Sequence, residues 1–330
     1  MNKWIVVTTI NAPTKAIRRI SDIVATGGWR CVVVGDRKTP SEWTSPGIDY
    51  LSYEEQLRQY GDLASLIPAN HYCRKNIGYL YAIERGAEVI LETDDDNIPL
   101  ETFGSDIQRT ISADLVGGNR WINVYKYFSE SLIWPRGNPL DTIHDAGRPL
   151  GEITSHTPIQ QYLADGDPDV DAIYRMLFKA PLNFNQRTPV MLEENCWCSF
   201  NSQNTLFFKE AFPLLYLPCH VSFRMTDIWR SFVAQAGLWS QGHRLAFRNA
   251  TVVQERNEHN LMKDFRDEVD GYLNNDRIAD CLSRVLEQQR GTSMAEFSAC
   301  AWQGLHELGV VKSEELEIHR AWSHRCAAVA

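Results

Sequence analysis

In the segment Glu88-Val89-Ile90-Leu91-Glu92-Thr93-Asp94-Asp95-Asp96-Asn97, an apolar run leads directly into three consecutive carboxylates. Such a run predicts a buried strand. Neighbouring like charges are costly unless a cation or hydrogen-bond donors compensate, and a divalent metal is the usual compensation. Alternate side chains of an extended segment share a face, so Asp94 and Asp96 can point at one Mg²⁺ or Mn²⁺ while Asp95 faces another partner. The alternative is a solvated acidic turn that caps a helix beginning near Pro99.

The residues before this stretch alternate between strand and helix patterns, which is typical of a doubly wound α/β sheet. Ile5-Val6-Val7-Thr8-Thr9 predicts a first buried strand, and Cys31-Val32-Val33-Val34 predicts a second. Apolar residues at helical spacing predict helices over 17–24 and 77–83. Ligands of such sheets bind outside the carboxyl ends of the strands. The polar residues expected together at that edge are Thr8, Thr9, Asp36 and Asp94 to Asp96.

The rest of the chain has a different character. From about 117 to 225 the pattern loosens into short runs rich in Pro, Trp and Asn, which predicts a mixed sheet with long loops. After about 260 it becomes helical. We therefore expect one α/β domain over 1–260, in two halves that meet near 116, followed by a helical extension over 261–330.

Composition excludes several classes of protein. A length of 330 residues with 44% hydrophobic residues is sufficient for a large core, and a formal charge of −9 argues against a nucleic-acid partner. The first residues do not resemble a secretory signal, and there is no uninterrupted apolar run of roughly 18 residues, the length a membrane span needs. The sequence also has no P-loop, no GxGxxG after the first strand, no GxSxG and no HExxH. With eight scattered cysteines, the composition favours a cytoplasmic protein with free thiols and no membrane span.

Two segments that contain basic residues could bind a phosphate or supply a general base. Arg74 and Lys75 open a predicted helix, where their charges and the helix amino end could meet a phosphate; the alternative is an ordinary helix start. Asp227 lies within the aromatic and basic segment Phe223 to Arg230, where partial desolvation could raise its pKa towards that of a general base. The alternative for Asp227 is the N-cap of a helix over 228–233.

Two further polar segments are considered. The run Asp165 to Asp171 superficially resembles a calcium loop, but Val170 replaces the required glycine and Met176 stands in place of the bidentate glutamate. A turn followed by a helix starting near Asp171 is the simpler interpretation, with binding of substrate hydroxyls as the alternative. His259 could be a late metal ligand or a phosphate donor, although a lone histidine is more often an ordinary surface or core residue.

Several of these segments, in fixed order, resemble the STELLO-type glycosyltransferase-like family over roughly residues 3 to 272. The matching segments are Thr8 to Asn11, Val34 to Pro40, Arg74 to Tyr79, Thr93 to Asn97 and Gln161 to Arg175. That family is in turn similar to the UDP-arabinopyranose mutases, the reversibly glycosylated polypeptides. Arg136-Gly137-Asn138-Pro139 looks like their Arg-Gly-x-Pro segment, and Thr226-Asp227-Ile228-Trp229 looks like their Asp-Asp-x-Trp segment, with a departure at Thr226.

The resemblance implies a GT-A fold, which is a Rossmann-like doubly wound mixed sheet, with a helical C-terminal region. It also implies a nucleoside-diphosphate sugar, UDP-linked by analogy, and Mn²⁺ or Mg²⁺. By this analogy residues 1–116 form the nucleotide-binding half and 117–260 the acceptor half, with Asp227 near the acceptor as the base. The implied donor site comprises Thr8, Thr9, Asp36, Arg74, Lys75, Asp94 and Asp95, and the expected metal ligands are Asp94, Asp96 and His259.

The function we expect is transfer of a sugar from a UDP-sugar to a hydroxyl of a glycan or polysaccharide acceptor. One alternative is a mutase in which Arg136 is transiently glycosylated. Another is a non-catalytic, glycosyltransferase-like partner of a polysaccharide synthase. Plant STELLO proteins are Golgi membrane proteins with extra sequence before this domain, and we expect this chain to lack that anchor. The apolar stripe of the C-terminal helices could form a homodimer contact or a domain cap.

Overall fold

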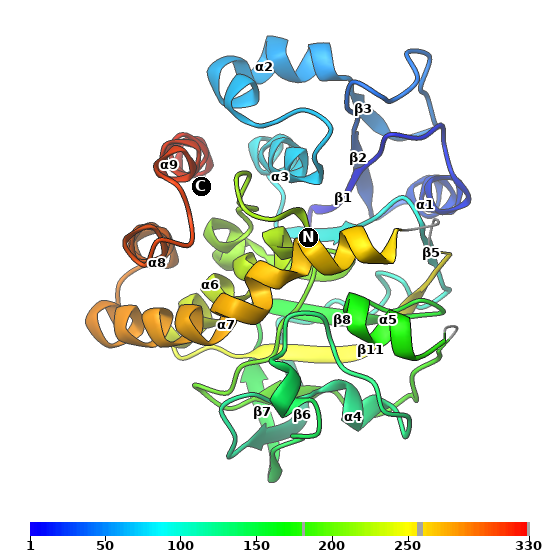
Figure 1. The fold of residues 1–330 in the computed structure, drawn as a ribbon. Coiled ribbons are helices and arrows are strands. Elements are labelled where there is room, and N and C mark those ends of the chain that lie inside the picture. Colours follow the sequence, from blue (N-terminus) through cyan, green and yellow to red (C-terminus); the bar gives the residue numbers. More distant parts are fainter. Residues whose placement is uncertain (180–181, 256–259, 329–330) are drawn as a thin grey trace.

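A computed structural model describes residues 1–179, 182–255 and 260–328 (Figure 1). The described residues form one mixed sheet, and its strands are β1 (Lys3–Thr8), β2 (Arg30–Val34), β3 (Asp49–Leu51), β4 (Val89–Thr93), β5 (Asn97–Pro99), β6 (Thr110–Gly117), β7 (Arg148–His156), β8 (Ile159–Asp165), β9 (Val190–Leu192), β10 (Asn204–Phe208) and β11 (Leu245–Gln254). Their order is β3-β2-β1-β4-β10-β8-β11-β9-β6-β7, and β5 pairs with β11. The mixed α/β architecture with C-terminal helices is that of a Rossmann-like GT-A fold, as predicted.

The first four strands of the sheet run parallel. Val6 of β1 lies opposite Val32 of β2 on one side and Glu92 of β4 on the other. Strand β3 continues the parallel pairing beyond β2, whereas β10 pairs antiparallel with β4. Because parallel strands end at the same edge, the segments that follow β1, β2 and β4 are brought together there.

The helices are α1 (Lys15–Ala25), α2 (Tyr53–Leu66), α3 (Lys75–Glu84), α4 (Tyr125–Phe128), α5 (Ala172–Leu177), α6 (Thr226–Ser240), α7 (Leu261–Gln289), α8 (Met294–Glu307) and α9 (Ser313–Ala327). Helices α1 and α3 cover opposite faces of the parallel strands. Ile17 of α1 shares a buried cluster with Ile5 and Val7, while Ile77 of α3 shares another with Val6 and Val32. The period of two along each strand therefore sends alternate residues into two cores, as a doubly wound sheet requires.

Helix α3 lies very close to β1 and β2 because residue 78 has no side chain. A Cβ atom on Gly78 would stand 2.6 Å from Val6 Cγ1 and 2.7 Å from Val34 Cγ2, both in the buried core. We therefore expect Gly78→Ala to lower the free energy of unfolding by about 1–2 kcal/mol, since overpacking outweighs the better helix propensity of alanine. Urea unfolding measures this change. Gly304→Ala in α8 is the matched control, because its nearest neighbour is 3.2 Å away, and a Gly78 variant as stable as the wild type would contradict the close approach.

The C-terminal helices return to the amino-terminal half of the chain, and α9 lies beside α2 and α3 in Figure 1. The Trp322 indole donates to the Asn76 carbonyl at 3.1 Å. The buried Glu315 carboxylate accepts the amides of Cys219 and His220 at 2.9 and 2.7 Å. The helical character after 260 is thus confirmed, while the division of the chain at 260 into two domains stays a prediction.

The sequence alternative of a helix beginning near Pro99 is wrong, because Asn97–Pro99 pair antiparallel with Val252 to Gln254 as strand β5.

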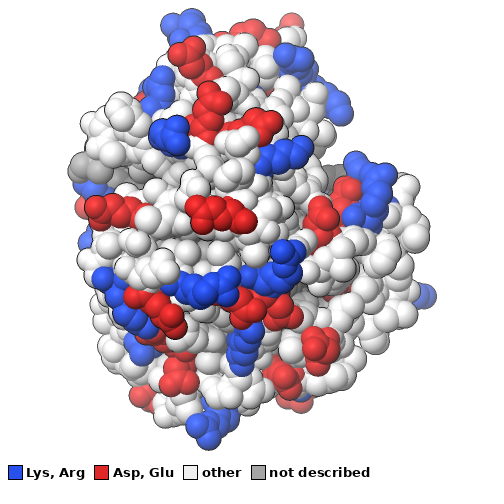
Figure 2. Space-filling view, turned by 60° about the vertical axis from the view of Figure 1, so that its left-hand side comes forward, with Lys and Arg blue, Asp and Glu red and all other residues white. Residues whose placement is uncertain are grey.

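Among the described residues, no helix has the length and apolar character needed to cross a membrane. Figure 2 shows acidic and basic side chains interspersed on the face it presents, without one continuous basic surface among the residues described there.

Candidate functional site

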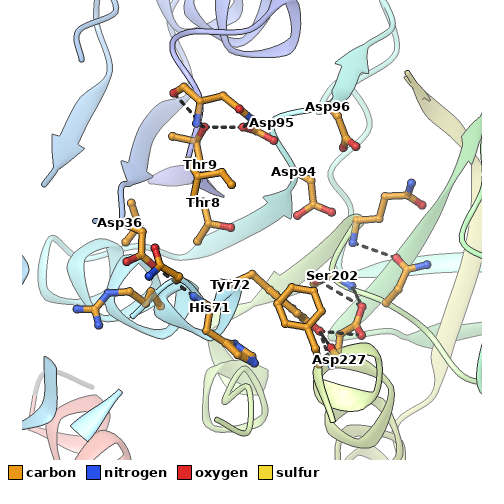
Figure 3. A pocket seen from close by; sticks show the side chains of 18 of the residues that line it. Thr8, Thr9, Asp36, His71, Tyr72, Asp94, Asp95, Asp96, Ser202 and Asp227 are labelled. Atoms are coloured by element: carbon orange, nitrogen blue, oxygen red, sulfur yellow. Dashed lines mark hydrogen bonds between the residues drawn. The ribbon is translucent and has the colours of Figure 1, made fainter. Parts of the chain in front are cut away.

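A pocket of about 330 Å³ lies at the carboxyl ends of β1, β2 and β4 (Figure 3). The sequence-predicted residues that line it are Thr8, Thr9, Asp36, Arg74, Asp94, Asp95, Asp96, Arg136 and Asp227. These residues come from six separate segments of the chain. The predicted convergence of the strand ends is therefore observed, while the chemical role of each residue stays a prediction.

The acidic triplet divides its side chains between two directions, as alternation predicts. Asp95 turns back towards β1, where its Oδ2 accepts from Thr9 Oγ1 at 2.5 Å and from Asn11 Nδ2 at 3.0 Å. Asp94 and Asp96 turn away from Thr9 in Figure 3. Asp94 contacts Lys75, and Asp96 accepts from Gln254 Nε2 at 3.1 Å. Asp95 thus fixes the loop after β1, which leaves Asp94 and Asp96 as the carboxylates facing the pocket.

Lys75 lies beneath the triplet instead of lining the pocket, which does not support its predicted contact with a phosphate. Its buried ammonium donates to Asp94 Oδ1 at 2.7 Å and to the carbonyls of Thr93 and Ser202 at 3.0 and 3.2 Å. All three N–H groups are therefore used within the protein. Burial raises the pKa of Asp94, and the charge of Lys75 offsets only part of that rise. Lys75 thereby holds the end of β4 against the loop that carries Ser202.

Arg74 is also directed into the protein. Its Nε donates to Gln56 Oε1 at 2.7 Å and its Nη1 to the Ile67 carbonyl at 2.9 Å, and the side chain is almost fully buried. Its guanidinium carbon lies 4.6 Å from the centre of the Tyr53 ring. Part of Arg74 reaches the pocket wall, but its donors serve helix α2, so the predicted phosphate contact is not supported.

Arg136 forms a buried ion-pair cluster with two carboxylates on the opposite wall. Its Nε and Nη2 donate to Asp169 at 2.9 and 2.7 Å, and Nη1 and Nη2 donate to Asp227 at 3.1 and 3.0 Å. Nη1 also donates to the Arg224 carbonyl. All five N–H groups of the guanidinium are engaged. Burial alone would lower the pKa of Arg136, but the charges of Asp169 and Asp227 outweigh burial and raise it above its ordinary value.

The expectation of a raised pKa for Asp227 is wrong. Burial alone would raise it, but the charge and hydrogen bonds of Arg136 outweigh burial and lower the pKa of Asp227 to about 2. The predicted N-cap role is also wrong, because the N-cap position of α6 is Met225 and Asp227 lies in the first turn. Asp227 therefore carries a stable negative charge at neutral pH.

Several residues at the site were not singled out from the sequence. The Ser202 amide donates to Asp227 Oδ2 at 3.1 Å, and the Tyr72 hydroxyl lies 3.1 Å from Asp227 Oδ1. His71 reaches the pocket beside Tyr72, and its amide donates to Asp36 Oδ2 at 3.2 Å. The only sequence signal for His71 and Tyr72 is their place just before Arg74. Asp169 belongs to the acidic run that was considered for hydroxyl binding, but nothing in that run identified Arg136 as its partner.

Comparison with known proteins places this site in a family. A sequence model described as "STELLO glycosyltransferases" matches residues 224–316, which include Asp227 and all of α6 and α7. The chain is 30% identical over 301 residues to "Probable glycosyltransferase STELLO2" of Arabidopsis thaliana, covering 84% of this chain and 38% of that protein. It is also 30% identical over 269 residues to "Probable glycosyltransferase STELLO1" of the same plant, covering 74% and 34%. The chain belongs to the STELLO glycosyltransferase family.

This STELLO-family chain spans little more than a third of the length of the relatives it matches. The alignment with STELLO2 extends over most of the chain, so it includes more than the segment matched by the family model. The relation to the UDP-arabinopyranose mutases stays a prediction.

The residues of the triplet fit a hard divalent cation that arrives with its ligand. Within the described part of the chain, no group of three or more His, Cys, Asp or Glu side chains is arranged to hold a metal by itself. Mg²⁺ in nucleotide sites commonly takes one or two carboxylates and completes its coordination with substrate phosphates and water. Asp94 and Asp96 supply two carboxylates of that kind at the pocket. His259, the third predicted ligand, lies outside the described residues.

Proposed function

We propose that this chain transfers a glycosyl group from a UDP-sugar to an acceptor hydroxyl, with a divalent metal at Asp94 and Asp96. The observation that carries the proposal is that, in a chain of the STELLO family, the pocket lies at the carboxyl ends of β1, β2 and β4. Two carboxylates at the end of β4 face it from one wall, and the Arg136 ion-pair cluster lies at the other. A site with these two chemically different walls suits a donor diphosphate and an acceptor.

In this proposal the donor lies across the ends of β1, β2 and β4. Thr8, Thr9 and Asp36 line that side of the pocket. Thr9 and Asp36 are buried, so this side lies deep in the protein. Asp94 and Asp96 would hold the metal, which supplies positive charge to the diphosphate as it leaves. Lys75 keeps Asp94 in place from below through its 2.7 Å contact. In this arrangement Thr8, Thr9 and Asp36 would contact the nucleoside, and Asp94 and Asp96 would hold the diphosphate through the metal.

The acceptor side is formed by the segment around α6. A carboxylate whose pKa is about 2 takes up a proton poorly at neutral pH, which argues against Asp227 as the base that removes the acceptor proton. Asp227 instead orients Arg136 and Tyr72, because its carboxylate accepts hydrogen bonds from the Arg136 guanidinium and from the Tyr72 hydroxyl. We propose that this fixed charge positions the acceptor side of the pocket.

The environment of Arg136 argues against the mutase alternative. A nucleophilic arginine needs a nitrogen that has lost its proton, but the two acidic neighbours of Arg136 raise its pKa. Its N–H groups also point to Asp169, Asp227 and the Arg224 carbonyl. A sugar attached there would displace at least one of these contacts.

The proposed function is tested by nucleotide binding. We expect UDP and at least one UDP-sugar to stabilise the wild-type protein only with Mn²⁺ or Mg²⁺, because binding shifts the folding equilibrium by mass action. At a ligand concentration of roughly 100 times Kd the gain is about 2.7 kcal/mol. Thermal shift and calorimetry measure it, with ADP and GDP as nucleotide controls. No stabilisation by any nucleoside diphosphate or its sugar would remove the glycosyltransferase proposal.

The same samples separate the two alternatives. Release of UDP from a bound UDP-sugar, to water or to an added saccharide, distinguishes an enzyme from a non-catalytic partner that only binds. Mass mapping of the peptide that carries Arg136, after incubation with labelled UDP-sugar, would reveal a glycosylated arginine only in a mutase.

A further inference from the structure

An exposed aromatic side chain stands at the mouth of the pocket. Phe223 lines the pocket yet is 46% exposed, whereas most large apolar side chains of the described residues are buried. It begins the short 3₁₀ helix Phe223–Met225 that leads into α6. Its ring lies edge-on to His71 and to Tyr72, with ring centres 4.9 Å apart in each case. His71 and Tyr72 are stacked with centres 5.4 Å apart, and we name the three rings the aromatic rim.

The aromatic rim is held in place by both walls of the pocket. The Tyr72 hydroxyl lies 3.2 Å from the Phe223 carbonyl and accepts from the Asp227 amide at 3.2 Å. On the other side, the His71 amide donates to Asp36, and His71 Nδ1 accepts from the Cys73 amide at 3.1 Å. The rim is therefore a fixed surface that keeps one phenyl ring in contact with water. A water-accessible aromatic ring held in a fixed position beside a pocket is available to stack against a ligand.

The surroundings of the rim indicate the chemistry of its ligand. The face of an aromatic ring carries partial negative charge, so it attracts polarised C–H groups. Charged and hydroxyl groups adjoin it at Asp227, Arg136 and Tyr72. A pyranose ring combines a face of C–H groups with a border of hydroxyls, which matches this arrangement.

We infer that the aromatic rim is a binding subsite for a sugar ring of the acceptor, with Phe223 as its platform. This inference rests on the proposed function. A nucleobase could also stack on an aromatic ring, but the depth of the side chains favours the acceptor. Thr9 and Asp36, on the proposed donor side, are 5% and 7% exposed, whereas Phe223 lies at the entrance. An acceptor glycan approaches from solvent and therefore meets the entrance first.

The test is ligand-observed NMR with a panel of methyl pyranosides, added to protein saturated with UDP and the diamagnetic ion Mg²⁺. The panel contains the α and β anomers of glucoside, galactoside, mannoside and xyloside. We expect the wild type to bind at least one of them, Phe223→Ala to weaken that binding by about fivefold, and Phe223→Tyr to retain it, because tyrosine keeps the ring. The Kd for UDP, measured by calorimetry, is expected to stay within about twofold in both variants.

Phe178→Ala is the matched control, because Phe178 is 38% exposed and is not among the residues that line the pocket. Its affinity for the pyranosides should equal that of the wild type. Equal binding by Phe223→Ala and wild type, or an equal loss with Phe178→Ala, would overturn the inference. A parallel loss of UDP affinity in Phe223→Ala would also overturn it and assign the ring to the nucleobase. If the wild type binds UDP but none of the pyranosides, only the subsite fails, whereas failure to bind UDP removes the proposed function as well.

Discussion

Replacing Arg136 by Ala is expected to lower the free energy of unfolding by about 3–5 kcal/mol at neutral pH, the range found when one partner of a buried ion pair is removed. The side chains of Arg136, Asp169 and Asp227 are only 6%, 9% and 5% exposed. The substitution leaves two carboxylates buried without their cation. Urea unfolding at pH 7.5 measures the loss, and adding Asp169→Asn to the variant should recover part of it by removing one of the two charges.

The loss should depend on pH in a direction that the pKa of Asp227 predicts. In the wild type this pKa is about 2, below its ordinary 3.8, so the carboxylate adds stability above about pH 4 and loses it as the pH falls towards 2. Without Arg136, burial acts with less opposition and the pKa of Asp227 should rise. Protonation then relieves the buried charge, so the deficit of the variant should be smaller at pH 4.5 than at pH 7.5.

A matched control separates the buried cluster from the general effect of removing an arginine. Arg58 pairs with Glu55 on the surface of α2, where its side chain is 73% exposed. Arg58→Ala should change stability little at either pH, because exposed pairs are screened by solvent. An equal loss in the two variants, or a deficit of Arg136→Ala that does not change with pH, would contradict the role given to the cluster.

Asp96→Asn is expected to reduce metal-dependent release of UDP from a UDP-sugar by about a hundredfold or more. Metal ions stabilise developing charge by several kcal/mol, and each 1.36 kcal/mol corresponds to tenfold in rate. Asn keeps the size of the side chain but removes the negative charge that the proposed metal needs. The assay is UDP release at a series of Mn²⁺ concentrations, and the half-saturating concentration should rise as well. The melting temperature should stay close to that of the wild type, since Asp96 lies at the pocket surface.

Asp95→Asn is the control for this prediction because it changes the same charge one residue away. Its carboxylate faces Thr9 and Asn11, so its loss should affect the loop after β1 more than the metal dependence. Asp94 is itself a proposed metal ligand, and its replacement would also leave the buried Lys75 ammonium with one fewer acceptor, so it is not used as a control. Full activity of Asp96→Asn with unchanged Mn²⁺ dependence would rule out the proposed metal position.

Elements with a strong local pattern could be predicted from the sequence. The apolar runs of β1, β2 and β4 and the helical spacing in α1 and α3 gave the doubly wound half correctly. The helix after Asp171 was also predicted, and the structure shows Asp171 accepting the Tyr174 amide as its N-cap. These features depend on side chains a few residues apart, which is the range over which periodicity and capping act.

The local sequence pattern was enough to predict β1, β2 and β4, the edge at which they end, and the alternation that turns Asp95 away from Asp94 and Asp96. The tertiary structure, in contrast, sets the charges and hydrogen-bond partners of the site. It brought Arg136 to Asp169 and Asp227, 33 and 91 residues away along the chain, and thereby lowered a pKa that burial alone would have raised. It also turned the donors of Arg74 and Lys75 into the protein and brought Phe223 to His71 and Tyr72. The pattern along a chain fixes which face a side chain occupies, whereas its charge and contacts depend on partners that only folding brings within a few ångströms.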